Sequence, residues 1–197
     1  LAACGTIAHS TPAGTPAPIA AATPADGVVP VGVGPTNYTV QPQPAAGTCI
    51  YRHSAAGQPL PDSHCTPGAT NPKVLQSNLT QTICRAGYSK SIRPPASITN
   101  TEKRANARSY SFTGSFKAAE YDHLISLELG GDPNDPRNLW VEPPSPGHRP
   151  ADGVNNPKDL VEKKLHDAVC SNQVPLSAAQ QAIATDWTTA LTRLNLP

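Results

Sequence analysis

Two adjacent residues, Asp122 and His123, are the strongest candidates for chemistry in this sequence. A neutral His can take a proton from a water molecule near working pH, and a carboxylate offers the hard oxygen that Mg²⁺ prefers. The pattern around them predicts a strand over residues 120–129. Neighbouring side chains of a regular strand point to opposite faces. The two residues therefore serve one site only if the strand is bulged or twisted there, or if one of them acts through its backbone.

The elements that must position this pair follow directly in the chain. Gly130-Gly131, with Asp132-Pro133, opens a turn-rich loop, and residues 139–141 are expected to return as the second strand of a hairpin. Asn156-Pro157 then predicts a helix start, because Asn is a good N-cap and Pro suits the first turn. That helix is expected to end near Cys170. Further helices are expected at 71–83, at about 100–108 and from Ser177 onward. This order predicts an α+β domain, in which a small antiparallel β-hairpin and a helix pack with several additional helices.

The stretch from Tyr121 to Cys170 resembles the HNH, or ββα-metal, nuclease family, and residues 49–195 resemble exported bacterial proteins of that type. The matching residues are Asp122-His123-Leu124-Ile125, Gly130-Gly131, Asn138-Leu139-Trp140, Lys158-Asp159, Cys65-Thr66-Pro67-Gly68-Ala69, Thr82-Ile83-Cys84, Val169-Cys170 and Asp186-Trp187. The resemblance implies a ββα-metal core with a distortion in its first strand. It further implies that His123 is the general base, that Asp122 is a metal ligand, and that Asn138 fastens the loop between the strands and so orients the base.

The resemblance also implies a third metal position at the start of the following helix. Asn155 stands three residues before Lys158, the spacing expected for an Asn ligand followed by a Lys. Asn156 and Asp159 compete for this position, although helix capping explains both of them. We expect Asn155 first and Asp159 second, and His148 in the long loop could also swing in. Hard oxygen ligands favour Mg²⁺ as the metal, with Mn²⁺ as the alternative.

The formal net charge of +1 hides an uneven distribution of charge along the chain. Residues 63–119 carry eight basic residues against Glu102 alone, whereas residues 120–186 carry eleven acids against five basic residues. A basic segment beside an acidic, metal-suited one favours a phosphodiester substrate, although both could be ordinary solvated faces. Nothing in the sequence specifies bases, so backbone contacts without sequence preference are expected. The expected substrate-binding residues are Arg93, Arg104, Arg108 and Lys158.

The first 48 residues differ in composition from the rest of the chain. They contain no Lys or Arg and a single acid, Asp26, among many Ala, Pro, Gly and Thr residues. Such a stretch buries too little apolar surface to offset chain entropy, so residues 1–48 are expected to form a flexible tether before a domain over 49–197. Leu1-Ala2-Ala3-Cys4 resembles a bacterial lipoprotein processing site with Cys4 as the lipidated residue; the alternative is an arbitrary boundary. No run of 18 apolar residues is present, which excludes a membrane-spanning helix from this sequence.

The remaining cysteines indicate an oxidising compartment. Cys49, Cys65, Cys84 and Cys170 can form two disulfides, and no C-x-x-C arrangement suggests a zinc knuckle. Three pairings are possible and the sequence does not choose among them. One of these pairings, Cys49–Cys65 with Cys84–Cys170, would anchor both ends of the domain.

Together these features predict an exported, metal-dependent HNH-type endonuclease that hydrolyses DNA, or RNA, with little sequence specificity. We expect it to be a monomer, secreted or held in the cell envelope, that meets a membrane only through a lipid at Cys4. One alternative is a non-catalytic cell-surface binding or structural module that keeps the HNH-like fold. Another is a metal-dependent hydrolase that accepts a small phosphate ester.

Overall fold

The computed structural model describes residues 28–149 and 156–197 of the chain. The expected lipidation site Cys4 and the expected metal ligand Asn155 lie outside these residues. The described part is a mixed α+β fold with two separate two-stranded antiparallel sheets. Its elements are β1 (Arg52–His53), β2 (Pro59–Leu60), the 3-10 helix η1 (Gln76–Gln81), α1 (Tyr88–Ser91), α2 (Ala96–Ser109), β3 (Glu120–His123), the 3-10 helix η2 (Leu127–Leu129), β4 (Leu139–Glu142), α3 (Pro157–Cys170), α4 (Leu176–Asp186) and α5 (Ala190–Arg193).

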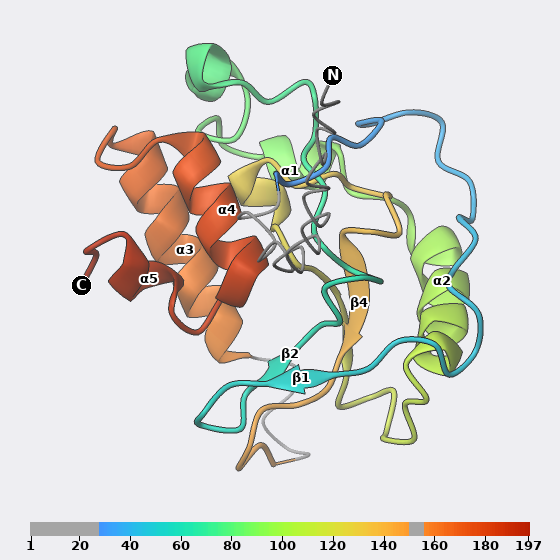
Figure 1. Cartoon of the computed structure of the whole chain (residues 1–197). Helices are drawn as coiled ribbons and strands as arrows, with labels where there is room; N and C mark the ends of the chain where they lie inside the picture. The colour runs from blue at the N-terminus through green and yellow to red at the C-terminus, as the bar shows by residue number, and fades with distance from the viewer. Residues whose placement is uncertain (1–27, 150–155) are drawn as a thin grey trace, which may run out of the picture.

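The hairpin β3–β4 lies at the centre of the fold. α2 lies on one side of it, and α3, α4 and α5 lie on the other (Figure 1). The register pairs Asp122 with Trp140 and His123 with Leu139. Trp140 and Leu139 are at most 1% exposed. The expected hairpin is therefore confirmed, with buried residues of β4 fixing its position.

The main hydrophobic core lies on the α3–α4 side. Pro157 occupies the first turn of α3, and Leu165 and Val169 from that helix are fully buried in the core. Buried Ile183 of α4 joins them. Burial of a Leu, Ile or Val side chain contributes about 1.5–3 kcal/mol, so this packing holds α3 and α4 together. The helix expected from Asn156-Pro157 to Cys170 is confirmed.

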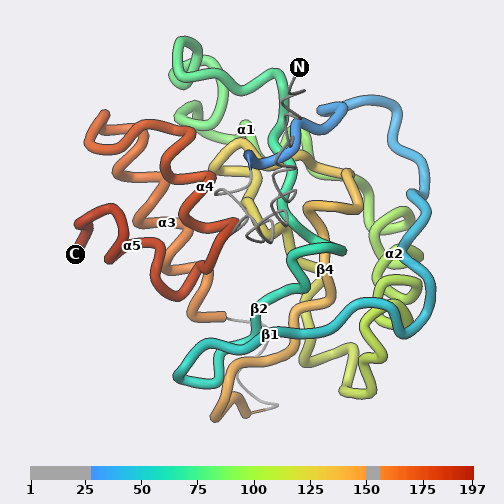
Figure 2. Tube along the Cα trace, viewed as in Figure 1, coloured from blue at the N-terminus to red at the C-terminus, as the bar shows by residue number. Residues whose placement is uncertain are grey.

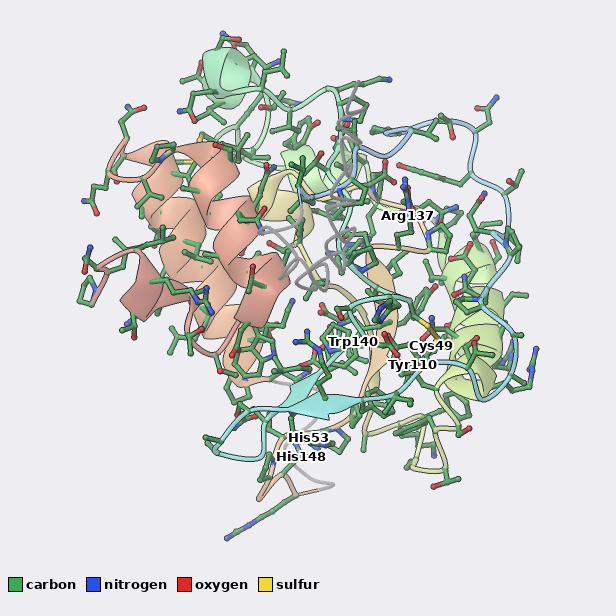
Figure 3. The ribbon with its side chains drawn as sticks, in the orientation of Figure 1. Cys49, His53, Tyr110, Arg137, Trp140 and His148 are labelled. Atoms are coloured by element: carbon green, nitrogen blue, oxygen red, sulfur yellow. A yellow bond between two sulfur atoms is a disulfide. The ribbon has the colours of Figure 1, made fainter. Side chains whose placement is uncertain are left out.

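A second, smaller cluster lies beneath the hairpin. It joins Cys49, Tyr110, Leu124 and Trp140 (Figure 3). The ring of Tyr51 stacks on Tyr110 with centroids 4.6 Å apart. The hairpin is thus packed against residues that come from before β1 and from the end of α2.

Two expected elements differ from the structure. The first strand ends at His123 rather than at Leu129, because the chain turns into η2 and then reaches Gly130 in the left-handed region at φ 72°. A side chain at Gly131 would meet the Ile125 carbonyl oxygen 1.7 Å away, so the turn needs glycine there. The expected helix over 71–83 begins only at Gln76 and is a 3-10 helix.

Both disulfides of the pairing that anchors the domain ends are formed. Cys49 is bonded to Cys65 and Cys84 to Cys170. The second bond joins the chain after η1 to the end of α3, across 86 residues of sequence. Closing so long a loop restricts the unfolded chain, which is worth roughly 4–5 kcal/mol in the chain-entropy account.

Residues 28–48, expected to belong to the flexible tether, lie along the body of the fold and pass beside α2 (Figure 2). The Gln41 amide donates to the Glu102 carboxylate at 2.7 Å, and the Ser109 hydroxyl donates to the Pro44 carbonyl at 2.5 Å. The packed part of the chain therefore includes this segment, which corrects the domain boundary expected at residue 48. Backbone and side-chain hydrogen bonds hold it, and these leave no signature in composition.

Within the described residues, no helix has both the length and the apolar character needed to cross a membrane.

Candidate active site

Asn138 fastens the loop between the two strands. Its side chain is fully buried and makes four hydrogen bonds. The oxygen accepts from the Ile125 amide at 3.0 Å and the Ala69 amide at 3.3 Å, and the nitrogen donates to the Ile125 carbonyl at 3.0 Å and the Asp132 carbonyl at 2.9 Å. All these partners are main-chain groups, so the Asn138 side chain holds the backbone of the loop in place at Ile125 and Asp132.

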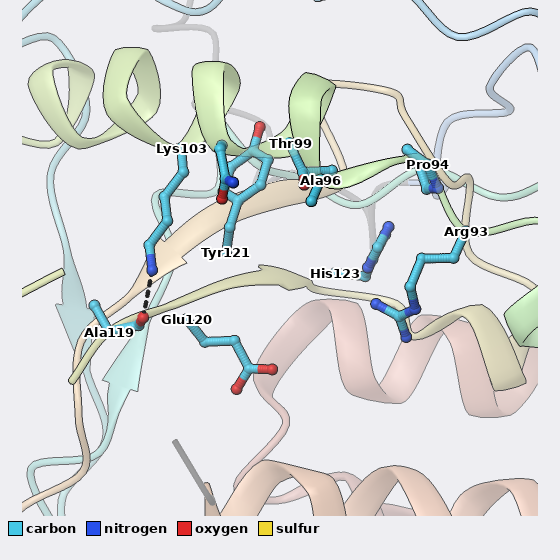
Figure 4. Close-up of a pocket in the computed structure, with 10 residues that line it drawn as sticks. Arg93, Pro94, Ala96, Thr99, Lys103, Ala119, Glu120, Tyr121 and His123 are labelled. Atoms are coloured by element: carbon cyan, nitrogen blue, oxygen red, sulfur yellow. Dashed lines mark hydrogen bonds between the residues drawn. The ribbon is translucent and has the colours of Figure 1, made fainter. Parts of the chain in front are cut away.

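Asp122 and His123 point to opposite faces of β3. Both residues pair in regular register with β4, without a bulge between them. His123 lines a groove on the α2 side (Figure 4). The Asp122 carboxylate instead forms an ion pair with Lys158 of α3 at 2.8 Å. The expected distortion of the strand is therefore not found. One group links the pair instead, because the Lys158 ammonium also donates to the His123 carbonyl at 2.9 Å.

The His123 ring is buried and held in one orientation. Its Nε2 lies 3.0 Å from the Pro133 carbonyl oxygen in the hairpin loop. A carbonyl can only accept, so Nε2 carries the hydrogen and Nδ1 keeps a free electron pair. Burial lowers the pKa of His123 to about 4, more strongly than the Pro133 carbonyl raises it. The ring is therefore neutral at pH 7, and Nδ1 is available as a base.

The groove on the α2 side has a volume of about 350 Å³. Arg93 and His123 lie toward one end of it, and Lys103 and Ala119 lie toward the other (Figure 4). The Lys103 ammonium donates to the carbonyls of Phe116 at 2.9 Å and Ala119 at 2.6 Å, so it fixes that end of the groove. An arginine beside a neutral histidine suits a phosphate group that must be held and attacked.

The other expected substrate-binding residues are not gathered in this groove. Arg104 and Arg108 are exposed on α2 but are not among the residues that line it. Lys158 is only 1% exposed and lies on the opposite side of β3, which corrects its expected role in substrate binding. His148 lies in the loop after β4, toward β1, and also does not line the groove (Figure 3).

Buried carboxylates surround Lys158 on the α3 side. Its ammonium contacts Asp122 and, more closely, Glu162 one turn later on the same helix. Burial alone would lower the pKa of Lys158, but Asp122, Glu162 and Glu142 together raise it above its ordinary value. Lys158 therefore stays charged and compensates part of the negative charge around it.

The carboxylates outnumber this single ammonium. Glu120 and Glu142 face each other in the register of the hairpin, an unfavourable arrangement for two like charges. Burial, followed by Asp122, raises the pKa of Glu120 to about 7, and burial raises that of Glu162 to about 8. Partial burial and Asp122 also raise the pKa of Asp159. One Glu142 oxygen, Oε1, is buried without a hydrogen-bond partner.

These residues carry the oxygen ligands that a hard divalent cation takes, but no three of the described carboxylates bring their oxygens within 4.8 Å of one another. Carboxylate oxygens are the ligands that Mg²⁺ prefers, and the partnerless Glu142 oxygen lies in a cluster with too few positive charges. Asp122 and Asp159 are the described members of the expected ligand set. The Asn156 side chain donates to Glu120 at 3.1 Å, which draws the start of α3 to the same cluster.

A different group of metal-ligand type side chains lies at the C-terminal end of α3. Among the described residues, His, Cys, Asp and Glu ligand atoms gather in threes within 4.8 Å only at Cys84, His166 and Cys170. The two sulfurs are joined in a disulfide, and His166 Nε2 contacts the Ile83 carbonyl oxygen at 3.0 Å. The disulfide and this contact account for the group without a metal ion.

Sequence reasoning missed Glu142, Lys103 and the Pro133 carbonyl. Of these, only Glu142 could have been found from the sequence. Trp140 pairs with Asp122 in the hairpin, and Glu142 stands two residues after Trp140 on the same strand. The side chain of Glu142 therefore lies on the same face of the hairpin as that of Asp122. Comparison of the chain with protein-family models, with curated protein sequences and with solved structures finds no significant match.

Proposed function

We propose that this protein is an extracytoplasmic, metal-dependent endonuclease of the HNH type that hydrolyses phosphodiester bonds of DNA, or RNA, with little sequence specificity. The observation that carries the proposal is the state of His123. Its ring is neutral, its Nε2 is tied to the hairpin loop, none of the described residues bonds to its Nδ1, and His123 and Arg93 line one groove. The two disulfides support an oxidising compartment.

In the proposed reaction, His123 Nδ1 takes a proton from a water molecule as the water oxygen forms a bond to phosphorus. The bond between phosphorus and the leaving sugar oxygen breaks, and that oxygen takes a proton from solvent. The products are one phosphate monoester end and one hydroxyl end. Arg93 holds the phosphate, and Asn138 keeps the loop, and with it the Pro133 carbonyl, in the position that orients the ring.

A bound Mg²⁺, or Mn²⁺, would neutralise the charge that develops on the phosphate and the leaving oxygen. Asp122 and Asp159 are the described residues proposed to hold it, with Asn155 as the third. Among the described residues, β4 is the only strand that pairs with β3, so the other edge of β3 joins no further described strand. A phosphate at that edge can meet groups from both faces of the strand, which allows Asp122 and His123 to act on one substrate.

One observation favours a second candidate, a non-catalytic binding module. The Lys158 ammonium already neutralises Asp122, so part of the carboxylate charge is compensated without any metal. In that case the groove with Arg93 would bind a phosphate backbone, and His123 would have only a structural role.

Cleavage of supercoiled plasmid separates the two candidates. The oxidised full chain is incubated with Mg²⁺, Mn²⁺ or EDTA, together with His123→Ala and His123→Gln variants. His53→Ala, which changes an exposed histidine on another strand, is the matched control. Metal-dependent nicking that His53→Ala retains and both His123 variants lose by 10²-fold or more supports the nuclease. Folded protein that cuts with neither metal refutes it in favour of the binding module.

A further inference from the structure

The groove beside His123 has an aromatic surface at its opposite end. The only two phenylalanines of the chain, Phe112 and Phe116, meet there with ring centroids 6.0 Å apart in an edge-to-face arrangement. Phe116 is 45% exposed, and Phe112 packs on the small cluster of Ala107, Ala119 and Val141. Phe112 thus supports Phe116 from below, while part of the Phe116 ring remains open to solvent.

Lys103 connects this aromatic surface to the groove. Its ammonium lies 5.8 Å from the centroid of the Phe116 ring and donates to the Phe116 carbonyl. The same ammonium bonds to the Ala119 carbonyl, and both Lys103 and Ala119 line the groove (Figure 4). Two of its three N–H groups are used in this way, so Lys103 chiefly fixes the Phe116 loop at the end of the groove away from Arg93 and His123.

Basic residues lie at and beside the groove, and the one acid in its lining, Glu120, turns its carboxylate away from α2 (Figure 4). Asn100, Arg104 and Arg108 follow at intervals of four residues and so form one stripe along α2, which starts at the groove. Arg93 is exposed beside His123. Glu102 is the one acid of residues 63–119, and it is fully buried and so leaves this stripe without an exposed acid.

We propose that the groove between α2 and β3 binds a single-stranded segment of nucleic acid, with a phosphate at Arg93 and His123 and an unpaired base stacked on Phe116. A duplex hides the faces of its bases, whereas a single strand offers each base to an aromatic ring. Stacking and backbone contacts need no particular base, so the binding is tolerant of sequence. The inference deepens the proposed function by naming its substrate class. Cleavage of the phosphate held at Arg93 and His123 rests on the proposed function, whereas binding of the single strand does not.

Fluorescence polarisation tests the proposal with the full chain in EDTA, where metal-dependent cleavage is absent. The probes are a fluorescein-labelled 12-nucleotide oligo(dT), the matching oligo(rU), and a hairpin duplex of equal length. Phe116→Ala is compared with Phe116→Trp, which keeps a stacking surface, and with Leu160→Ala, which truncates another exposed apolar residue on α3.

Single strands should bind more tightly than the duplex. Phe116→Ala should weaken single-strand binding by about 5- to 150-fold, the range expected for one stacked base, and leave duplex binding unchanged. Phe116→Trp and Leu160→Ala should bind single strands like the unaltered protein. Arg93→Ala should weaken binding of both forms and lower the salt dependence by about one charge.

Equal affinity for single strand and duplex, or no effect of Phe116→Ala, would overturn the inference. These outcomes are independent of catalysis. Binding that depends on Phe116, from a protein that cuts with no metal, supports the inference while it refutes the nuclease. Plasmid cutting that depends on His123, from a protein in which Phe116→Ala changes nothing, supports the nuclease and overturns the inference.

Discussion

The buried amide of Asn138 offers the sharpest test of how the hairpin loop is held. Asn138→Ala removes four hydrogen bonds to main-chain groups of three residues. Each contributes about 1 kcal/mol net, so the free energy of unfolding should fall by roughly 4 kcal/mol. For a chain of this length the melting temperature should drop by about 8–16 °C. Asn138→Asp should destabilise at least as much, because a carboxylate oxygen would then face the carbonyls of Ile125 and Asp132.

Urea denaturation of the oxidised proteins, followed by circular dichroism, measures this change. Asn100→Ala, an exposed asparagine on α2, is the matched control and should stay within about 0.5 kcal/mol of the unaltered protein. If Asn138→Ala lost less than about 1 kcal/mol, the loop would be held by other contacts. The account of how Asn138 positions the Pro133 carbonyl and the His123 ring would then fail.

Three further predictions concern charge and cross-links. Burial lowers the pKa of His123 to about 4 from an ordinary value near 6.5, so the stability it contributes is complete above pH 6.5 and is lost as the pH falls. Between pH 7 and 5, the unfolding free energy should therefore fall by roughly 2 kcal/mol more than in His123→Gln, and equal slopes would contradict this. Replacement of Cys84 and Cys170 by Ser should lower the free energy of unfolding by roughly 4–5 kcal/mol, and replacement of Cys49 and Cys65, which are 16 residues apart, by about 3 kcal/mol. Thermal unfolding that shows the reverse order would contradict the loop argument. Lys158→Met should lose about 3–5 kcal/mol at pH 9, where Glu162 and Glu120 are charged and left uncompensated, and less at pH 6, where both are protonated, whereas a loss that urea titrations find independent of pH would argue against the carboxylate cluster.

The elements that carry strong local signals were predictable. Asn156-Pro157 predicted the start of α3, and the Gly130-Gly131 turn with its flanking apolar residues predicted the hairpin. The strand over 120–129 was predicted too long because alternation continues past His123. There the chain leaves the ladder to bond with the buried Asn138 side chain, and a local pattern carries no information about such a partner.

The burial of Lys158 could not be predicted from the sequence. Lysine is among the least often buried residues, so a surface role in substrate binding was the natural expectation. Its burial depends on the register that brings Asp122 and Glu142 to the face of β3–β4 that meets α3. Residues 28–48 present the same difficulty, because their composition is that of a flexible linker while their contacts come from distant partners such as Glu102 and Ser109.

The balance of charge around Lys158 bears on the choice between enzyme and binding module. Stability alone gives little reason to keep a buried ion pair, since apolar residues of similar volume often stabilise a fold as well or better. Here two glutamates face each other in the hairpin, and one oxygen of Glu142 is buried without a partner, beside a single ammonium. One lysine compensates one carboxylate charge, and the raised pKa values of Glu120 and Glu162 show that charging the others is costly in the folded state. A second cation would remove this cost, and for that reason we favour the metal-dependent enzyme over the binding module.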